Sequence, residues 1–208
     1  MMKKLVIFLL FVFVFTSVSA QADTEILKKT ADWVTSLGLN DKEKEARLID
    51  VISTHLTVIK SWHDSHPYTM VPEGINPKTG EKLSVDDRQL IVDSTIPKTV
   101  HEALITGLRK DLTKEQVESI LDKYTIGKVD FTMKAYREIL PNMPKEMDEY
   151  MLNHLKQARE EAVDYKSMKE ISAIFKIYKT RIELYLYQNN YNWKTIYKEY
   201  VDSLKKNK

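Results

Sequence analysis

The sequence predicts an all-α protein, a single-domain bundle of several helices with one long Pro- and Gly-containing loop at residues 67–83. Apolar residues recur every three to four positions from about residue 24 onward, which is the spacing of helices that bury one face. Gly and Pro are few, at five and six of 208 residues, whereas all-β folds need many turn residues. No alternating apolar and polar pattern typical of strands occurs outside the 67–83 loop.

The first twenty residues have the composition of a secretory signal peptide. Two lysines precede the apolar run 5–15, and small residues lead up to Ala20. The run is shorter than the roughly 20 apolar residues that cross a bilayer. We expect cleavage after Ala20, with Ala22 as second choice, and export of the domain 21–208 to the periplasm or the cell exterior. A retained membrane anchor is the alternative. The chain has no cysteine, so it is not expected to be a lipoprotein.

The first two helices are bounded by recognisable stop and start residues. A helix over residues 24–37 is expected to end at Gly38, because glycine suits the left-handed conformation that follows many helices. Asn40 is expected to cap the next helix, with Glu43 three residues later completing a capping box. Pro67 disfavours helical geometry in the residue before it, so this helix should end near residue 66.

The remaining helices begin at signals of the same kind. The expected capping pairs are Ser84 with Asp87 and Thr113 with Gln116. Pro97 suits the first turn of the helix between them, and Pro141 should end a helix over 129–140. Three more amphipathic segments complete the chain, and their apolar stripes lie within 147–165, 168–185 and 193–204.

A cluster of histidines gives the candidate catalytic site. His55, His63 and His66 lie within twelve residues, and His63 and His66 share one side of a helix. The neighbouring Asp64 is able to orient an imidazole, and His63 to act as a base near neutral pH. The candidate catalytic residues are therefore His63 and Asp64, with Arg47 as an anion-binding partner. The alternative is that His55 and His63 are semi-buried packing residues and that His66 ends the helix.

Five further residues are candidates for ligand binding: His66, Tyr124, Arg159, Tyr187 and Tyr191. Tyr124 and Arg159 would serve as hydroxyl and anion partners of the histidine site. Tyr187 and Tyr191 lie off the main apolar stripes of the last two helices, and exposed tyrosine can stack on sugar rings. The other C-terminal tyrosines fall on those stripes and are expected to pack in the core.

Motif and charge analysis excludes several functions. The sequence contains no His-Glu-x-x-His, Glu-x-x-His, Gly-rich phosphate loop or Gly-x-Ser-x-Gly turn. The formal charge of +2 comes from two lysines in residues 1–20, a segment without acidic residues, so the exported chain is neutral. A neutral chain does not suit nucleic-acid binding, which requires neutralised phosphates. We expect no metal, no cofactor and no nucleic-acid partner, and the oligomeric state stays open.

Several short segments are jointly specific for a known family: Gly38-Leu39, Glu45-Ala46-Arg47, His63-Asp64, Leu112-Thr113-x-x-Gln116-Val117, Lys123-Tyr124-Thr125-Ile126-Gly127-Lys128, Gln157-Ala158-Arg159-Glu160-Glu161-Ala162 and Ile177-Tyr178-Lys179-Thr180-Arg181. Through them the chain resembles a family of secreted helical proteins of unknown function, common in Bacteroidetes and often encoded beside polysaccharide-degrading enzymes. The resemblance implies an exported, non-catalytic binding or accessory protein in polysaccharide utilisation, with a glycan or protein partner. An enzyme centred on His63 and Asp64, acting on glycans or related small substrates, is the alternative.

A second resemblance rests on Leu112-Thr113-x-x-Gln116 and on its degenerate copy at residues 39–43. Leu-Thr-x-x-Gln at a helix start is similar to the mark of the Spy/CpxP-type periplasmic chaperones. The resemblance implies a chaperone as a further alternative. Those chaperones are strongly basic, whereas this chain is nearly neutral.

Overall fold

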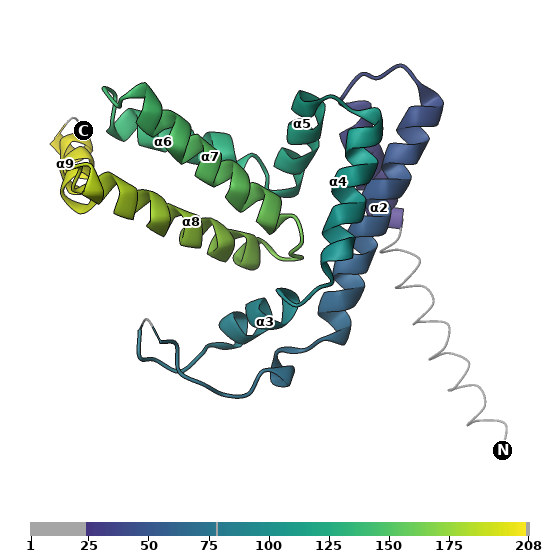
Figure 1. Cartoon of the computed structure of the whole chain (residues 1–208), viewed down its shortest axis with the longest axis horizontal. Coiled ribbons are helices and arrows are strands. Elements are labelled where there is room, and N and C mark those ends of the chain that lie inside the picture. Colours follow the sequence, from purple (N-terminus) through teal and green to yellow (C-terminus); the bar gives the residue numbers. More distant parts are fainter. Residues whose placement is uncertain (1–23, 78, 207–208) are drawn as a thin grey trace. The chain divides into compact units, whose positions relative to one another are not determined.

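The structure is a computed structural model that describes residues 24–77 and 79–206 (Figure 1). The predicted signal peptide lies outside the described residues. Within them the regular elements are helices, and the pairing of extended backbone is limited to one bridge between Ile75 and Lys82. The all-α prediction is thus confirmed. None of the helices in this part of the chain combines the length and hydrophobicity needed to cross a bilayer.

The helices gather into two compact units. Of the described residues, unit 1 comprises 24–67 together with 95–117, and unit 2 comprises 68–77 and 79–94 together with 118–206. Unit 1 holds helical residues 24–35, α2 (Lys42–Ser65), α4 (Lys98–Asp111) and the start of α5 (Lys114–Tyr124). Unit 2 holds the rest of α5, η1 (Tyr68–Met70), α3 (Val85–Asp93), α6 (Lys128–Ile139), α7 (Lys145–Ala162), α8 (Met168–Gln188) and α9 (Trp193–Lys206). The single domain over 21–208 stays a prediction.

Unit 1 is built on the close pairing of α2 with α4 (Figure 1). The buried apolar residues of the two helices are Leu48, Ile52, Ile59, Leu104, Ile105 and Leu108. Gly107 lies where the helices touch, since a Cβ atom built on it would be 2.7 Å from Cγ1 of Val51. The missing side chain therefore allows the two backbones to approach at this point.

The start of α2 differs by one residue from the predicted cap. Asn40 has a φ of +55°, a left-handed conformation that asparagine tolerates, and so cannot be the extended cap residue. Asp41 takes that place, and its side chain accepts a hydrogen bond from the backbone N–H of Lys44. The predicted ends are confirmed: Gly38 has a φ of +62° after the first helix, and His66 is the C-cap of α2.

Unit 2 has its core between α6, α7 and α8. The predicted stripe within 147–165 is confirmed, because all its members are buried: Met147, Met151, Leu155, Ala158 and Ala162 of α7, and Tyr165 just after it. The first member of the predicted stripe of α8, Met168, is instead exposed. It is the residue directly after the N-cap Ser167, where the helix has only begun to face the core.

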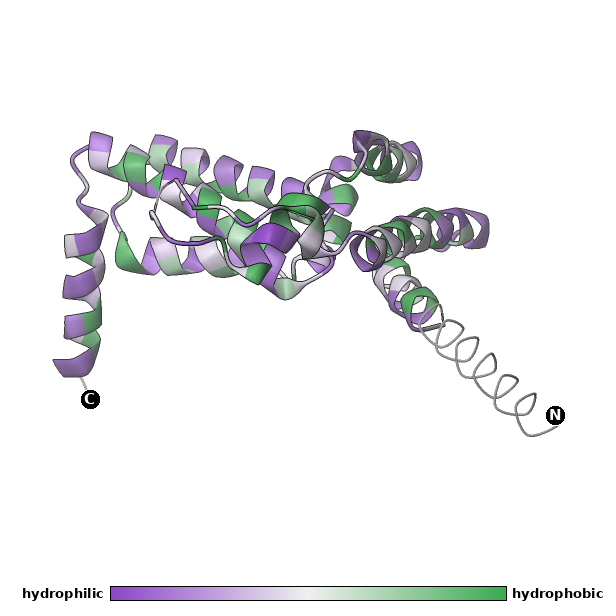
Figure 2. Ribbon diagram, turned by 90° about the horizontal axis from the view of Figure 1, so that it is seen from below, coloured by the Kyte–Doolittle hydropathy of each residue, from purple (hydrophilic) through white to green (hydrophobic). Residues whose placement is uncertain are grey.

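The last helix, α9, departs most from its predicted packing. None of its residues is buried, although its stripe from Trp193 to Leu204 is continuous. Trp193 and Ile196 pack against the core of unit 2, whereas Tyr197 and Leu204 stay about half exposed. Figure 2 shows α9 leaving the other helices of this unit after its first turns.

The long 67–83 loop is ordered by its own hydrogen bonds where the structure describes it. The N–H of Gly80, at a φ of +73°, donates to the carbonyl of Asn76, and the N–H of Asn76 donates to the carbonyl of Glu81. The Nε of Arg88 in α3 lies 2.8 Å from the carbonyl oxygen of Val71 and donates to it. The loop is therefore fastened to α3 of the same unit.

The connection between α5 and α6 contains a strained residue. Ile126 is β-branched, has a φ of +54° and is 72% exposed. A left-handed conformation costs a non-glycine residue about 1–2 kcal/mol. We expect Ile126→Gly to raise the free energy of unfolding by about 1 kcal/mol, because little burial is lost and the strain is relieved. Urea denaturation measures this change. Lower stability in the variant would show that Ile126 makes contacts that outweigh the strain.

Candidate functional site

A groove of about 350 Å³ lies between α2 and α4, within unit 1. Its walls are formed by Asp50, Val51, Thr54, His55 and Val58 of α2 and by Thr99, Val100, Ala103 and Leu104 of α4. The helices touch at Gly107, and the small side chains of Ala103 and Thr99 leave the space open nearer the start of α4. The volume falls within the range of small-molecule sites.

Four polar side chains border the groove. Asp50 and Thr54 are one turn apart on α2 and exposed, and Thr99 faces the solvent from α4. His55 is buried in the groove wall with 3% of its surface exposed. A carboxylate only accepts hydrogen bonds, whereas hydroxyl and neutral imidazole groups both donate and accept. The groove can therefore bind donors and acceptors while its valine and alanine side chains contact apolar surface.

The lining limits the chemistry of the groove. Among the described residues that line it, Asp50 is the single acidic residue, and there is no lysine or arginine. Hydrolysis of glycosidic bonds usually requires a pair of carboxyl groups on either side of the bond. The described lining of the groove therefore does not contain the carboxyl pair that this reaction uses. This site was not predicted from the sequence, although Asp50 and Thr54 are a polar i, i+4 pair on the predicted helix.

The three candidate catalytic residues do not form one site. Arg47 and His63 are on the same continuous helix, 16 residues apart, which is about 24 Å along its axis. Arg47 instead donates two hydrogen bonds to Asp111 of α4, at 2.9 and 3.0 Å. This pairing raises the pKa of Arg47 and lowers that of Asp111. Arg47 therefore lies far along the helix from His63 and Asp64, and a role for Arg47 as their anion-binding partner stays a prediction.

The other residues of the histidine cluster occupy different environments. His66 stacks on Trp62 with ring centroids 3.8 Å apart, and its Nδ1 is 2.8 Å from the Trp62 carbonyl oxygen. Asp64 pairs with Lys60 one turn earlier, at 3.1 Å on the helix surface. His63 is half-buried. The role of His66 as a helix-ending residue agrees with the packing alternative, and catalysis by His63 and Asp64 stays a prediction.

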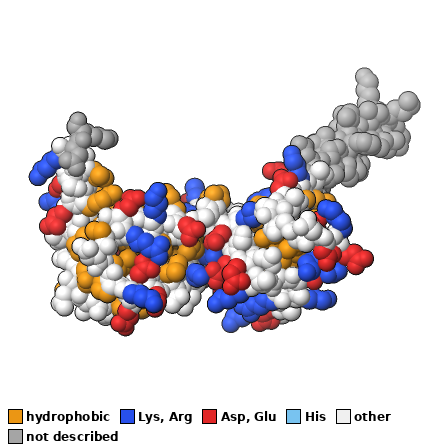
Figure 3. All heavy atoms as spheres, turned by 90° about the horizontal axis from the view of Figure 1, so that it is seen from above, with side chains coloured by type: hydrophobic (Ala, Val, Ile, Leu, Met, Phe, Trp, Pro, Cys, Tyr) orange, Lys and Arg blue, Asp and Glu red, His pale blue; other side chains and the backbone are white. Residues whose placement is uncertain are grey.

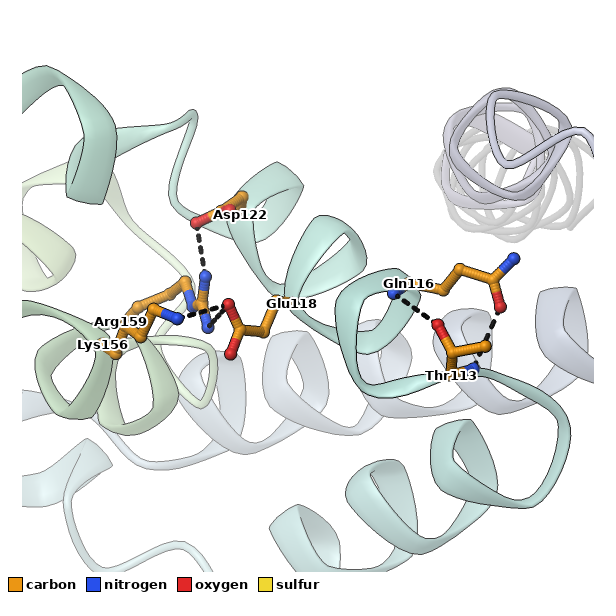
Figure 4. A network of polar contacts seen from close by, with 6 residues as sticks. All are labelled: Thr113, Gln116, Glu118, Asp122, Lys156 and Arg159. Atoms are coloured by element: carbon orange, nitrogen blue, oxygen red, sulfur yellow. Dashed lines mark hydrogen bonds and ion pairs between the residues drawn. The ribbon is translucent and has the colours of Figure 1, made fainter. Parts of the chain in front are cut away.

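Arg159 belongs to an ion-pair network between α5 and α7, within unit 2 (Figure 4). Its side chain is 4% exposed, and its Nη1 lies 2.8 Å from Oδ1 of Asp122. Its Nη2 is 4.0 Å from Oε2 of Glu118, which lies 2.6 Å from the Nζ of Lys156. The guanidinium is thus engaged by carboxylates and shielded from solvent, which favours a structural role over ligand binding.

The tyrosine candidates differ in exposure. Tyr124 is buried, and this burial raises the pKa of its hydroxyl well above the ordinary value. Tyr191 is half-buried and packs against the core of unit 2. Tyr187 is 68% exposed and so is the one of the three that presents its ring to the solvent.

The Leu-Thr-x-x-Gln segment forms the predicted helix start (Figure 4). The N–H of Thr113 donates to Oε1 of Gln116 at 3.0 Å, and the N–H of Gln116 donates to Oγ1 of Thr113 at 3.3 Å. Leu112 and Val117, the expected apolar staple, are both buried. The capping-box prediction is confirmed, and it gives the motif a structural reason.

A family model for DUF3826, described as a protein of unknown function, matches residues 23–206. The chain belongs to the DUF3826 family. The match contains residues of both compact units and every described helix. A comparison with curated proteins found no match. The prediction of an uncharacterised family is therefore confirmed, and membership in DUF3826 brings no assigned activity.

Proposed function

We propose that this DUF3826 protein is exported and binds a glycan, without catalysis, in the groove between α2 and α4. The observation that carries the proposal is the lining of the groove, where hydrogen-bonding groups and aliphatic surface accompany a single carboxylate. Export is supported by the composition of residues 1–20.

The chemistry of a sugar unit matches this lining. A pyranose ring has hydroxyl groups at its rim and C–H groups on its faces, so a site needs polar and apolar contacts together. The Asp50 carboxylate accepts hydrogen bonds from hydroxyls, and the hydroxyls of Thr54 and Thr99 donate or accept them. The side chains of Val58 and Val100 cover the C–H face. Because the described lining includes no cationic Lys or Arg, we propose neutral sugars over acidic or sulfated ones.

The setting that we propose is polysaccharide utilisation in Bacteroidetes, in which the protein acts as an accessory binder. The resemblance of segments such as His63-Asp64 to the secreted family supports this setting, as does the composition of residues 1–20. The enzyme alternative loses Arg47 from its site, since about 24 Å of helix separates it from His63. The chaperone alternative is not needed to explain the Leu112–Gln116 motif, because the motif forms the N-terminal cap of a helix.

The test is calorimetric titration with a panel of neutral oligosaccharides of glucose, mannose, galactose and xylose. We expect binding by at least one of them, and a loss of about tenfold in affinity on Asp50→Asn, since a hydrogen bond to a charged group contributes about 1.5–3 kcal/mol. Ala103→Leu should abolish binding by filling the groove. Ala46→Leu, at an exposed position of α2 that does not line the groove, is the matched control.

Two results would contradict the proposal. One is that no oligosaccharide of the panel binds, and the other is that Ala103→Leu and Ala46→Leu bind equally well. Cleavage of a bound oligosaccharide, followed by chromatography of the products, would contradict the absence of catalysis.

A further inference from the structure

The C-terminal helix α9 carries an apolar strip that its own unit leaves uncovered. Trp193 packs against Tyr136 with ring centroids 4.8 Å apart, and the hydroxyl of Tyr200 lies 3.4 Å from Oε2 of Glu138. Beyond these contacts, Tyr197 is 50% and Leu204 49% exposed. At about 100° per residue, Tyr197, Val201 and Leu204 fall within an arc of about 60°. We call these three residues the exposed strip.

Lysines line the solvent side of the exposed strip. The same helical geometry places Lys194, Lys198 and Lys205 at about 20–60° from Val201, directly beside the strip. All three are exposed. The acidic residues of α9, Glu199 and Asp202, lie about 100–160° from Val201, although the Nζ of Lys205 is 3.7 Å from Oδ1 of Asp202.

Three of the four lysines of α9 therefore lie beside the exposed strip, whereas Lys206 lies on the opposite face with Glu199 and Asp202. Figure 3 shows hydrophobic and basic side chains, with some acidic ones, around the C-terminal end of the chain. Three lysines next to the apolar strip give one face of the helix both hydrophobicity and positive charge. A partner that covers this face must be apolar where it meets the strip and negative where it meets the lysines.

We propose that α9 binds the surface of a bilayer that contains anionic lipid. Amphipathic helices with an apolar face and flanking lysines lie in the interface of such membranes, where tyrosine is also favoured. Lysine side chains are long enough for their ammonium groups to reach the headgroups while the strip enters the acyl boundary. Figure 2 shows α9 projecting from the other helices of its unit, so its apolar strip and the lysines beside it can meet an extended anionic surface.

The size of the contact predicts weak and salt-sensitive binding. Three apolar side chains and three lysines are fewer than the groups that anchor a protein permanently. Each lysine near an anionic surface strengthens binding by about fivefold, and this contribution decreases at high ionic strength. The helix would thus hold the protein reversibly at a membrane, whatever its groove binds.

Vesicle co-sedimentation of the full chain tests the proposal, with phosphatidylcholine vesicles that contain or lack 30% phosphatidylglycerol. We expect binding to the anionic vesicles that exceeds binding to neutral ones by at least tenfold and decreases in 0.5 M salt. Leu204→Asp should remove this excess. Lys198→Gln should weaken it about fivefold, whereas Lys206→Gln, the same change on the opposite face, should have less than a twofold effect. The apolar run 5–15 is common to all variants, so differences between them report on α9.

Equal sedimentation with both kinds of vesicle, or with neither, would overturn the proposal. Equal effects of Lys198→Gln and Lys206→Gln would also overturn it. They would show that binding depends on the net charge of the protein and not on one face of α9. All three substituted positions are exposed, and circular dichroism checks that the variants keep their helix content.

Discussion

Replacing Glu170 by Gln is expected to raise the free energy of unfolding by about 3 kcal/mol at pH 8.5 and to leave it nearly unchanged at pH 4. Glu170 is 5% exposed and lies next to Asp93, which is 4% exposed, within unit 2. One oxygen of Glu170 accepts a hydrogen bond from the N–H of Ser167, and Asp93 accepts one from Gln89. Two buried carboxyl groups thus meet where α3 ends and α8 begins.

The sign of the effect follows from the direction of the pKa shift. Burial, and the hydrogen bond and negative charge of Asp93, raise the pKa of Glu170 from 4.5 to about 7. Between these values the folded protein keeps a proton that the unfolded chain has lost, so stability decreases as the pH rises. The stabilisation is fully present below 4.5 and is lost as the pH rises through 7. Glutamine cannot ionise, and its amide is able to donate to Asp93 at every pH.

Urea denaturation at several pH values between 4 and 9 measures this difference. Glu199→Gln, an isosteric change at an exposed position of α9, should leave the pH dependence of the parent unchanged. A parallel loss of stability in Glu170→Gln and in the parent between pH 5 and 8.5 would contradict this prediction. It would show that Glu170 does not keep its proton in the folded protein.

Gly107→Leu is expected to lower the free energy of unfolding by about 3 kcal/mol, because it overpacks the contact between α2 and α4. Even a single Cβ at this position would lie within 2.8 Å of two methyl groups of Val51, a side chain with little freedom to move aside. Ala103→Leu adds the same terminal groups one turn earlier on α4, where the groove is open, and should cost less than 1 kcal/mol. Thermal and urea denaturation compare the two variants.

A combined substitution checks the cause of the Gly107 effect. Val51→Ala should reduce the cost of Gly107→Ala, since it removes the methyl groups that the new Cβ would meet. Costs that simply add in the double variant, or equal costs for Gly107→Leu and Ala103→Leu, would show that the helices do not make the close contact on which the shape of the groove depends.

Local sequence signals were sufficient to predict the helices. The capping pairs Ser84–Asp87 and Thr113–Gln116 form as expected, because each is decided by residues three positions apart. The predicted N-cap of α2 was wrong by one residue because Asn40 and Asp41 are both residue types that cap helices. The backbone conformation decides which of the two is the cap, and it is not evident from the sequence.

The candidate site was harder to predict because it depends on contacts between distant segments. The groove exists where Gly107 brings two helices together and Ala103 leaves space, and neither residue has a local signature of binding. Arg47 was recognisable as a charged residue, but its partner Asp111 lies on another helix. The amphipathic pattern of α9 predicted a buried face, yet a pattern does not reveal whether the chain supplies the covering surface.

The most direct test of glycan binding in the groove is methyl NMR spectroscopy of the protein during titration with an oligosaccharide that binds. Glycan binding in the groove predicts concentration-dependent shifts of the methyl signals of Val58, Val100 and Ala103, which line it. The signals of Leu186, which is fully buried in the core of unit 2, should remain unchanged. Shifts that leave the three groove residues unaffected and fall elsewhere would contradict the proposed site.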